Sequence, residues 1–193
     1  MEIQPGAPVR NRDVQIRIEG AALNDPAFED LREARSFVPG AILRHADYER
    51  LKRALHVRAA DRGYIDAHFV ESTLDVWPEL QAADVSLHFD SGSRYRIGEV
   101  HVDQSFLEDA VVAGYLDLER GGFFDSADLA QAHRDLSDSA YFGDIEILAD
   151  VENAANGEIP IRISLRPGTR IEYTVGIGAS SDTGVRFRAG FRN

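Results

Sequence analysis

Hydrophobic residues recur with the spacing of strands and helices along the first half of the chain. The first predicted strand has apolar residues at alternate positions: Val14, Ile16 and Ile18. Asp25 and Pro26 then suit the N-cap and the first position of a short helix. A second helix is predicted where apolar residues follow helical spacing up to a glycine at the C′ position: Tyr48, Leu51, Leu55, Ala59 and Gly63. Two further predicted strands, residues 68–78 and 83–92, give the order strand, helix, helix, strand, strand.

The same order of elements returns after Gly92. Its predicted strands span residues 95–103, 141–148 and 159–168. Ser105 and Glu108 have the spacing of a capping box and predict that a helix begins at Ser105. A second helix, with Leu129, Ala132 and Leu136 on one face, should begin at Ser126. Matching landmarks lie roughly 76 to 81 residues apart, a spacing that favours tandem small domains over a solenoid.

The repeat predicts an α+β fold with two tandem β-α-α-β-β modules. In each module a three-stranded sheet would carry two helices on one face, which buries the apolar stripes of both helices. We therefore divide the chain into a lead-in (1–12), a first module (13–92), a second module (93–168) and a terminal hairpin (169–193). The connection between the modules is too short to be a free linker, so we expect semi-rigid coupling.

The terminal hairpin has one apolar side. Its alternate positions are apolar: Ile171, Tyr173, Val175, Ile177, Val185, Phe187, Ala189 and Phe191. The positions between them hold charged, small or glycine residues, among them Arg186, Arg188 and Arg192. A hairpin packed on the second module is one interpretation, although four glycines weaken a small strand.

Composition and charge exclude several classes of function. The net charge of −12 opposes the attraction that binds proteins to nucleic acids or anionic lipids. The segment from Arg170 onward carries four arginines and two acids, a net of +2, which leaves −14 for the rest. The absence of cysteine rules out disulfides, thiolate zinc sites and cysteine nucleophiles. No apolar run approaches the roughly 18 residues of a membrane helix, and the N-terminus lacks the pattern of a secretion signal.

No motif predicts an active site, a cofactor or a metal centre. Asp182–Thr183–Gly184 matches the aspartic protease triplet, but a turn explains it better because only nine residues follow Gly184. Gly176 and Gly178 lack the lysine and helix of a phosphate loop. The histidines show no metal-ligand spacing: His45, His56, His68, His88, His101 and His133. We therefore expect that the protein is not an enzyme.

Four stretches carry a resemblance to a known family: "GYIDAHF", "DSGSRYRIGEVHV", "LSDSAYFGDIEI" and "GIGASSDTGVRFRAGF". They resemble the POTRA (polypeptide-transport-associated) modules of the BamA/TamA superfamily of outer-membrane assembly proteins, most closely the TamA-like branch. The resemblance covers essentially the whole chain. Its motifs are moderately specific singly and strong in their order and spacing.

The resemblance implies the periplasmic part of an outer-membrane β-barrel protein that assists insertion or translocation of outer-membrane proteins and autotransporters. A further module would precede Met1 and the rest of the barrel would follow Asn193. The implied partners are a TamB-like inner-membrane-anchored periplasmic protein, unfolded outer-membrane client polypeptides and, through the barrel, the outer membrane. In a barrel the apolar side of the hairpin would face lipid: Ile171, Tyr173, Val175, Ile177, Val185, Phe187 and Phe191. Alternatives within the resemblance are BamA, a two-partner-secretion transporter, or a soluble POTRA module such as that of a cell-division protein.

In the family, the strand after the second helix lies at the edge of its sheet. An edge strand can bind an extended segment by β-augmentation. The corresponding partner-binding residues here are His68, Val70, Ser72, Leu74, Val76, Phe142, Asp144 and Glu146. The alternative is that both edges are blunted, because Glu71, Asp75, Asp144 and Glu146 are the charges expected of a protected edge.

Overall fold

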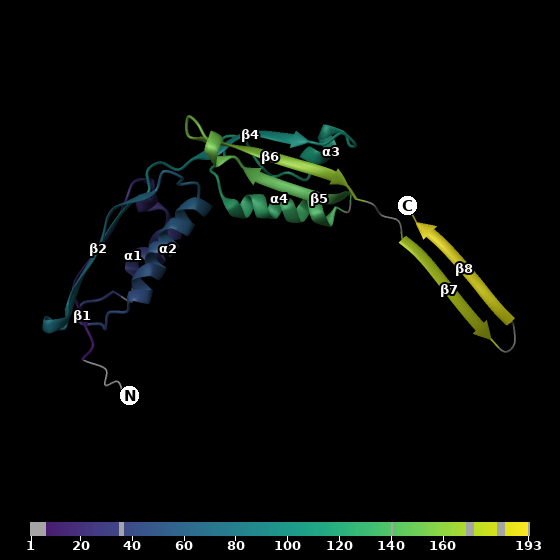
Figure 1. Ribbon diagram of the computed structural model, residues 1–193. Coiled ribbons are helices and arrows are strands. Elements are labelled where there is room, and N and C mark those ends of the chain that lie inside the picture. Colours follow the sequence, from purple (N-terminus) through teal and green to yellow (C-terminus); the bar gives the residue numbers. More distant parts are fainter. Residues whose placement is uncertain (1–6, 35–36, 140, 169–171, 181–183, 193) are drawn as a thin grey trace.

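The computed structural model describes residues 7–34, 37–139, 141–168, 172–180 and 184–192, and side chains as far as Gly168 with the exception of Asp109. Figure 1 shows two α+β units that follow one another along the chain and a two-stranded hairpin that lies apart from them. The predicted α+β class with two β-α-α-β-β units is confirmed.

The first unit is a three-stranded sheet with its helices on one face. Its elements are β1 (Arg10–Glu19), α1 (Glu29–Glu33), α2 (His45–Asp61), β2 (His68–Trp77) and β3 (Ala82–Asp90), with 3-10 turns at Ala21–Asn24, Pro26–Phe28 and Pro78–Leu80. The strand order is β1-β3-β2, so β3 lies in the centre. It pairs in parallel with β1 and antiparallel with β2. This order leaves β1 and β2 as the two edges.

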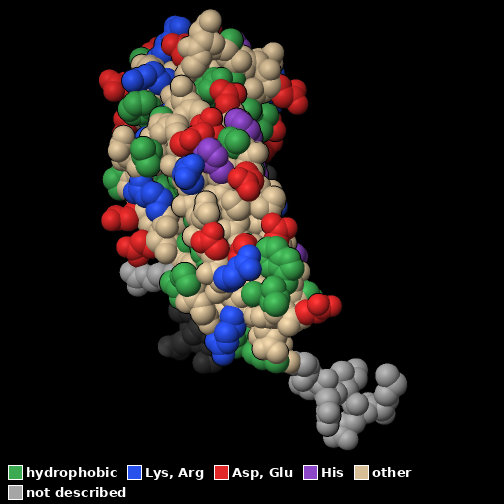
Figure 2. All heavy atoms as spheres, turned by 90° about the vertical axis from the view of Figure 1, so that its left-hand side faces the viewer, with side chains coloured by type: hydrophobic (Ala, Val, Ile, Leu, Met, Phe, Trp, Pro, Cys, Tyr) green, Lys and Arg blue, Asp and Glu red, His purple; other side chains and the backbone are tan. Residues whose placement is uncertain are grey.

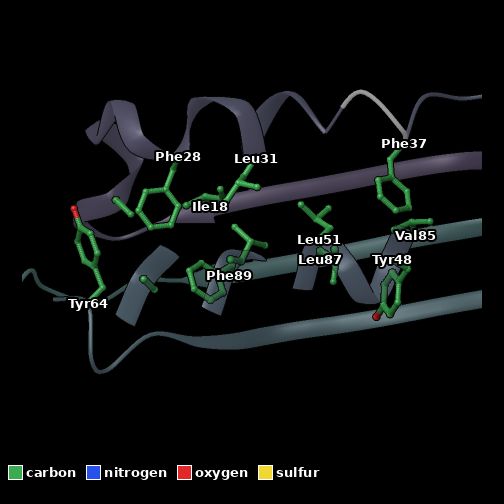
Figure 3. Close-up of a cluster of buried hydrophobic side chains, with 13 residues drawn as sticks. Ile18, Phe28, Leu31, Phe37, Tyr48, Leu51, Tyr64, Val85, Leu87 and Phe89 are labelled. Atoms are coloured by element: carbon green, nitrogen blue, oxygen red, sulfur yellow. The ribbon is translucent and has the colours of Figure 1, made fainter. Parts of the chain in front are cut away.

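The helix signals of the first unit are confirmed. Asp25 accepts a hydrogen bond from the N–H of Ala27 at 3.0 Å and so caps the turn that leads into α1. Gly63 ends α2 with a φ of 79°, a conformation that glycine adopts without strain. The apolar stripe of α2 is buried: Tyr48, Leu51, Leu55 and Ala59. Figure 3 shows Tyr48 and Leu51 in the core with Val85, Leu87 and Phe89 of β3. Leu55 and Ala59 belong to the same cluster.

The second unit repeats this plan. Its elements are β4 (Arg96–Asp103), α3 (Asp109–Ala113), α4 (Ser126–Asp138), β5 (Phe142–Ala149) and β6 (Glu158–Pro167), with a 3-10 turn at Val151–Asn153. The strand order is β4-β6-β5. The predicted start of α4 at Ser126 is confirmed, with Asp125 as its N-cap. The predicted helix start at Ser105 is wrong, because the side-chain oxygen of Gln104 accepts hydrogen bonds from the N–H groups of Phe106 and Leu107 and holds them in a turn.

Matching hydrogen bonds support the repeat at atomic detail. The Arg10 guanidinium donates to the carbonyl of Gly40 at 2.7 Å, and that of Arg96 to the carbonyl of Gly121 at 2.6 Å. An isolated bridge joins Arg10 to Ile42, and another joins Arg96 to Phe123. The loop before the second helix therefore closes the start of the first strand in each unit. β1 begins at Arg10, inside the stretch expected to be a lead-in, because Arg10 pairs with Ala82 of β3.

The hairpin consists of β7 (Glu172–Ser180) and β8 (Gly184–Arg192), paired antiparallel. Its register sets Tyr173 opposite Phe191 and Ile177 opposite Phe187. The register thus pairs positions of the apolar series in one strand with positions of that series in the other. None of the helices within the described ranges has the length and hydropathy needed to cross a membrane.

Candidate partner-binding edges and the joint between the units

The edges formed by β2 and β5 are the candidate functional site. Each strand pairs with the central strand of its sheet on one side. Within the described part of the chain, no backbone hydrogen bond from another segment reaches the outer side of either strand. Both strands therefore offer unpaired backbone donors and acceptors, which is the requirement for β-augmentation.

β2 is exposed along almost its whole length. Val70 is 55% and Val76 is 42% exposed, whereas Leu74 packs against the first core. Ser72 is exposed, and a hydrogen bond links it to the hydroxyl of Tyr48. The first residue, His68, places Nδ1 3.0 Å from the carbonyl oxygen of Asp66. The predicted residues thus lie on one edge strand, although Leu74 points its side chain inward.

β5 is shorter and more deeply seated. Phe142 is 7% exposed and belongs to the second core, so its side chain is not available to a partner. Asp144 and Glu146 are exposed and lie opposite Arg166 and Ser164 of β6. A partner at this edge would meet acidic side chains and the backbone.

Both edge strands have a β-bulge near their start. The register shifts between Phe69 and Glu71 in β2, and between Phe142 and Asp144 in β5. A bulge leaves one residue unpaired and increases the local twist. The regular ladders therefore run from Glu71 in β2 and from Asp144 in β5.

An arginine holds the aromatic side chain at the end of β2. The guanidinium carbon of Arg12 lies 4.6 Å from the ring centroid of Trp77, and its Nε donates to Asp84 at 2.9 Å. Trp77 is 37% and neighbouring Leu80 is 67% exposed. Figure 2, which looks at the side of the first unit, shows acidic, basic and hydrophobic side chains interspersed over this face. A segment that paired with β2 would therefore contact its backbone and a few apolar side chains.

A backbone contact joins the two units end to end. The N–H of Tyr95 in the second unit donates to the carbonyl of Gly63 in the first at 2.8 Å, and Tyr95 is itself held within the second unit by a bond from the N–H of Phe124 to its carbonyl at 3.1 Å. Ile65 packs against the core of the second unit. A Cβ atom at Gly63 would lie 2.9 Å from the Cβ of Phe124, so the joint fits closely around a glycine.

A network of hydrogen bonds between charged side chains lies at the same joint. Arg62 donates from Nε and Nη2 to the two carboxylate oxygens of Asp25, both at 3.3 Å, and from Nη1 to Asp125 at 2.6 Å. The Asp25 side chain is only 5% exposed. Arg94 lies beside this network and donates to the carbonyls of Arg62 at 2.8 Å and Phe124 at 3.1 Å. These bonds link the first unit to the second by side chains.

The network keeps Asp25 charged. Burial opposes the carboxylate, but hydrogen bonds from Ala27, Tyr64 and Arg62 outweigh it and hold the pKa of Asp25 below its usual value. Burial, together with the hydrogen bond to Asp25, raises the pKa of Tyr64 to about 12. Around neutral pH the joint therefore contains a carboxylate, a neutral phenol and a guanidinium.

The joint was not among the sites predicted from the sequence. Asp25 was identified only as a helix cap, Arg62 carried no motif, and Arg94 lay in the stretch "DSGSRYRIGEVHV" without an assigned role. One signal was present, since Asp125 precedes the predicted start of α4 as Asp25 precedes Pro26. Their sharing of one arginine could not be read from the sequence, because Arg62 is 37 residues from Asp25 and 63 from Asp125.

The other candidate residues either form no metal site or lie outside the residues that the structure describes. Across the residues with described side chains, no three His, Asp or Glu residues gather closely enough to hold a metal ion. Asp182 and Thr183 lie outside the described residues. Ile171 also lies outside them, as do the side chains of the other predicted lipid-facing residues.

Comparisons with known proteins bear on the fold. No protein-family model matches the chain. BamA from Haemophilus ducreyi lacking POTRA domains 1–3 aligns with a TM-score of 0.66 and 14% identity, over 96% of this chain and 34% of that structure. POTRA domains 3–5 of BamA from Haemophilus influenzae align with a TM-score of 0.54 and 19% identity, over 82% of this chain and 61% of that one. The chain thus spans about a third of the first of these structures and under two thirds of the second, and its two α+β units have the fold of POTRA domains.

Proposed function

We propose that the chain is the periplasmic scaffold portion of a TamA-like outer-membrane assembly protein. In this proposal residues 13–92 and 93–168 are POTRA domains, and the hairpin is the first of a membrane β-barrel. The edges at β2 and β5 bind extended segments of unfolded outer-membrane clients and assist their insertion or translocation. A TamB-like periplasmic protein is the proposed partner.

One observation carries the proposal: the outer edge of β2 is long, exposed and unpaired in the described part of a fold that resembles the POTRA domains of BamA. Protected edges are usually short, covered or twisted away. β2 has charges at Glu71 and Asp75 but also exposes Val70, Val76 and Trp77. This mixture suits reversible contact with many sequences.

The expected affinity is low. A client segment making about five backbone hydrogen bonds at ~0.5–1.5 kcal/mol each gains only a few kcal/mol before its ordering is counted. Ordering the segment opposes much of that gain. Weak and sequence-tolerant binding lets a client leave the edge for the barrel.

Cross-linking in the full-length protein tests the proposal. A photoreactive residue at Val76 should capture unfolded outer-membrane clients in cells, whereas one at Arg17 on the opposite edge strand should capture several-fold less. Val76→Pro should lower client delivery by more than its loss of thermal stability accounts for, because proline cannot donate to a ladder. Equal capture at both positions, or parallel losses of delivery and stability, would show that β2 is only a structural strand.

BamA is the second candidate within the same superfamily. The fold similarity to BamA supports it. Capture of a long inner-membrane-anchored protein by the full-length chain favours the TamA-like assignment, whereas its absence favours the BamA-like one.

A further inference from the structure

Arg62 joins the ends of two helices that belong to different units. It is the C-cap residue of α2, where its backbone N–H donates to the carbonyls of Arg58 and Ala59. Asp125 is the N-cap residue of α4. The pair thus puts a positive charge at the C-terminal end of one helix and a negative charge at the N-terminal end of the next. Each charge also suits the dipole of its own helix.

The two carboxylate oxygens of Asp125 accept hydrogen bonds from different units. Oδ1 accepts the N–H of Ala127 at 3.0 Å and caps α4, while Oδ2 accepts Nη1 of Arg62 at 2.6 Å. Arg62 uses its remaining donors as a fork on Asp25. One guanidinium is therefore held rigidly by the first unit and reaches one oxygen of the second. A planar fork of this kind fixes direction as well as distance.

The network acts beside a narrow backbone connection. Among the described residues, one backbone hydrogen bond crosses the joint, from the N–H of Tyr95 to the carbonyl of Gly63. A single backbone bond does not by itself oppose rotation of one unit about it, whereas the Arg62–Asp125 pair adds a second point of contact. Ser126 adds a further bond between the units, from its hydroxyl to Asp61 at 3.2 Å.

We infer that Arg62 is a positioning residue that sets the angle between the β2 and β5 edges through Asp25 and Asp125, so that a client segment leaving one edge meets the other. This inference rests on the proposed function. α2 belongs to the core beneath the first sheet, and α4 contacts β5 directly. Fixing α2 against α4 therefore fixes the two edges.

The substitution Asp125→Asn distinguishes the role of Asp125 in the joint from its role as the helix cap. Asparagine caps helices as well as aspartate does, but its only acceptor oxygen is then used by Ala127 and its amide group faces Arg62. Asp30→Asn is the matched control. It removes the same charge from the Arg58–Asp30 pair, which lies within the first unit at 3.2 Å. The chain has no native cysteine, so label pairs at Arg53→Cys in α2 and Gln131→Cys in α4 report one distance.

The experiment measures the distance distribution between the labels and client cross-linking in the full-length protein. We expect a single narrow distribution in the unmodified protein and in D30N. In D125N the distribution should be at least twofold broader with unchanged helix content. Cross-linking at Val76 of β2 should persist in D125N, while that at Leu148 of β5 should fall several-fold. Arg62→Lys, which keeps the charge but not the fork, should give an intermediate breadth.

Three outcomes overturn the inference. An unchanged distribution in D125N would show that the other contacts of the joint, such as the bond from Arg94 to the carbonyl of Arg62 and the packing of Ile65, hold it without the Arg62–Asp125 pair. A broader distribution with unchanged cross-linking at both edges would show that the angle does not matter to clients, and would leave the proposed function standing. Failure of unmodified protein to cross-link clients at either edge would remove the proposed function together with the inference.

Discussion

The two units have the same fold, but the segment that follows the second helix has different surroundings in each. Tyr64 and Tyr141 hold matching places after the second helix of each unit, yet Tyr64 is 3% and Tyr141 is 54% exposed. The hydroxyl of Tyr64 donates to Asp25 at 3.0 Å. Tyr141 instead lies beside Tyr115 and Phe142 at centroid distances of 6.5 Å. The matching tyrosine thus belongs to a closed joint in one unit and to an exposed aromatic cluster in the other.

The edge strand of the first unit is also longer and more exposed than that of the second. β2 spans ten residues, and residues near its end are exposed on both faces of the sheet. β5 spans eight, with Ile145 and Ile147 half-buried against the second core. α2 is likewise longer than α4. The first unit therefore offers the more accessible edge. In our inference, the ion pairs of Arg62 with Asp25 and Asp125 hold this unit in position relative to the second.

The largest effect is expected from an added methyl group at the joint. Gly63→Ala should destabilise the protein by about 2–4 kcal/mol, because alanine disfavours a positive φ and its Cβ would meet that of Phe124 at 2.9 Å. Gly40→Ala is the matched control, since Gly40 has a φ of 85° and open space around it. It should lose only about 1 kcal/mol. Chemical denaturation of both variants measures the difference, and equal losses would contradict a close fit at the joint.

A smaller effect, dependent on pH, is expected from the buried carboxylate. Asp25→Asn keeps the cap but loses the ion pair with Arg62, which should cost about 1–3 kcal/mol at neutral pH. Because the pKa of Asp25 is lowered in the folded protein, its contribution is present above the pKa of the unfolded chain, about 3.9, and is lost as the pH falls through the folded value.

The difference between Asp25→Asn and the unmodified protein should therefore shrink as the pH falls below about 4. Unfolding free energies measured from pH 7 to pH 3 give the result, with Asp30→Asn as an exposed control that changes little. A difference that stays constant over this range would show that Asp25 does not act as a charge in the joint.

Local spacing predicted the fold well because its causes are local. The stripe from Tyr48 to Ala59 and the caps at Asp25 and Gly63 depend on neighbours within a turn or two of the helix. The capping box at Ser105 failed for a similar reason. Gln104, one residue earlier, offers the backbone a competing acceptor, and spacing alone does not show which side chain is used.

The candidate site was predictable only in part. The family resemblance predicted that β2 and β5 lie at edges, and the observed strand order agrees, but the bulges before Glu71 and Asp144 have no signal in the alternation of residues. The burial of Phe142 was not predicted either, because a bulge changes which side of the strand a residue faces. Contacts of Arg62 with residues in two units depend on how those units meet, which hydrophobic periodicity does not encode.

The smallest effect on stability is expected at the end of β2. Trp77→Ala removes a partly exposed ring beneath Arg12 and should cost about 0.5–1 kcal/mol, because Arg12 keeps its bond to Asp84. Client cross-linking at Val76 should nevertheless fall several-fold, since the ring is the largest apolar group on that edge. Leu148→Ala is the matched control on β5, where Leu148 is 51% exposed, and it should leave capture at Val76 unchanged. Thermal melting and cross-linking of both variants decide between the edges. Equal loss of capture in the two variants would mean that clients bind a surface shared by both units, and that the greater exposure of β2 has no functional consequence.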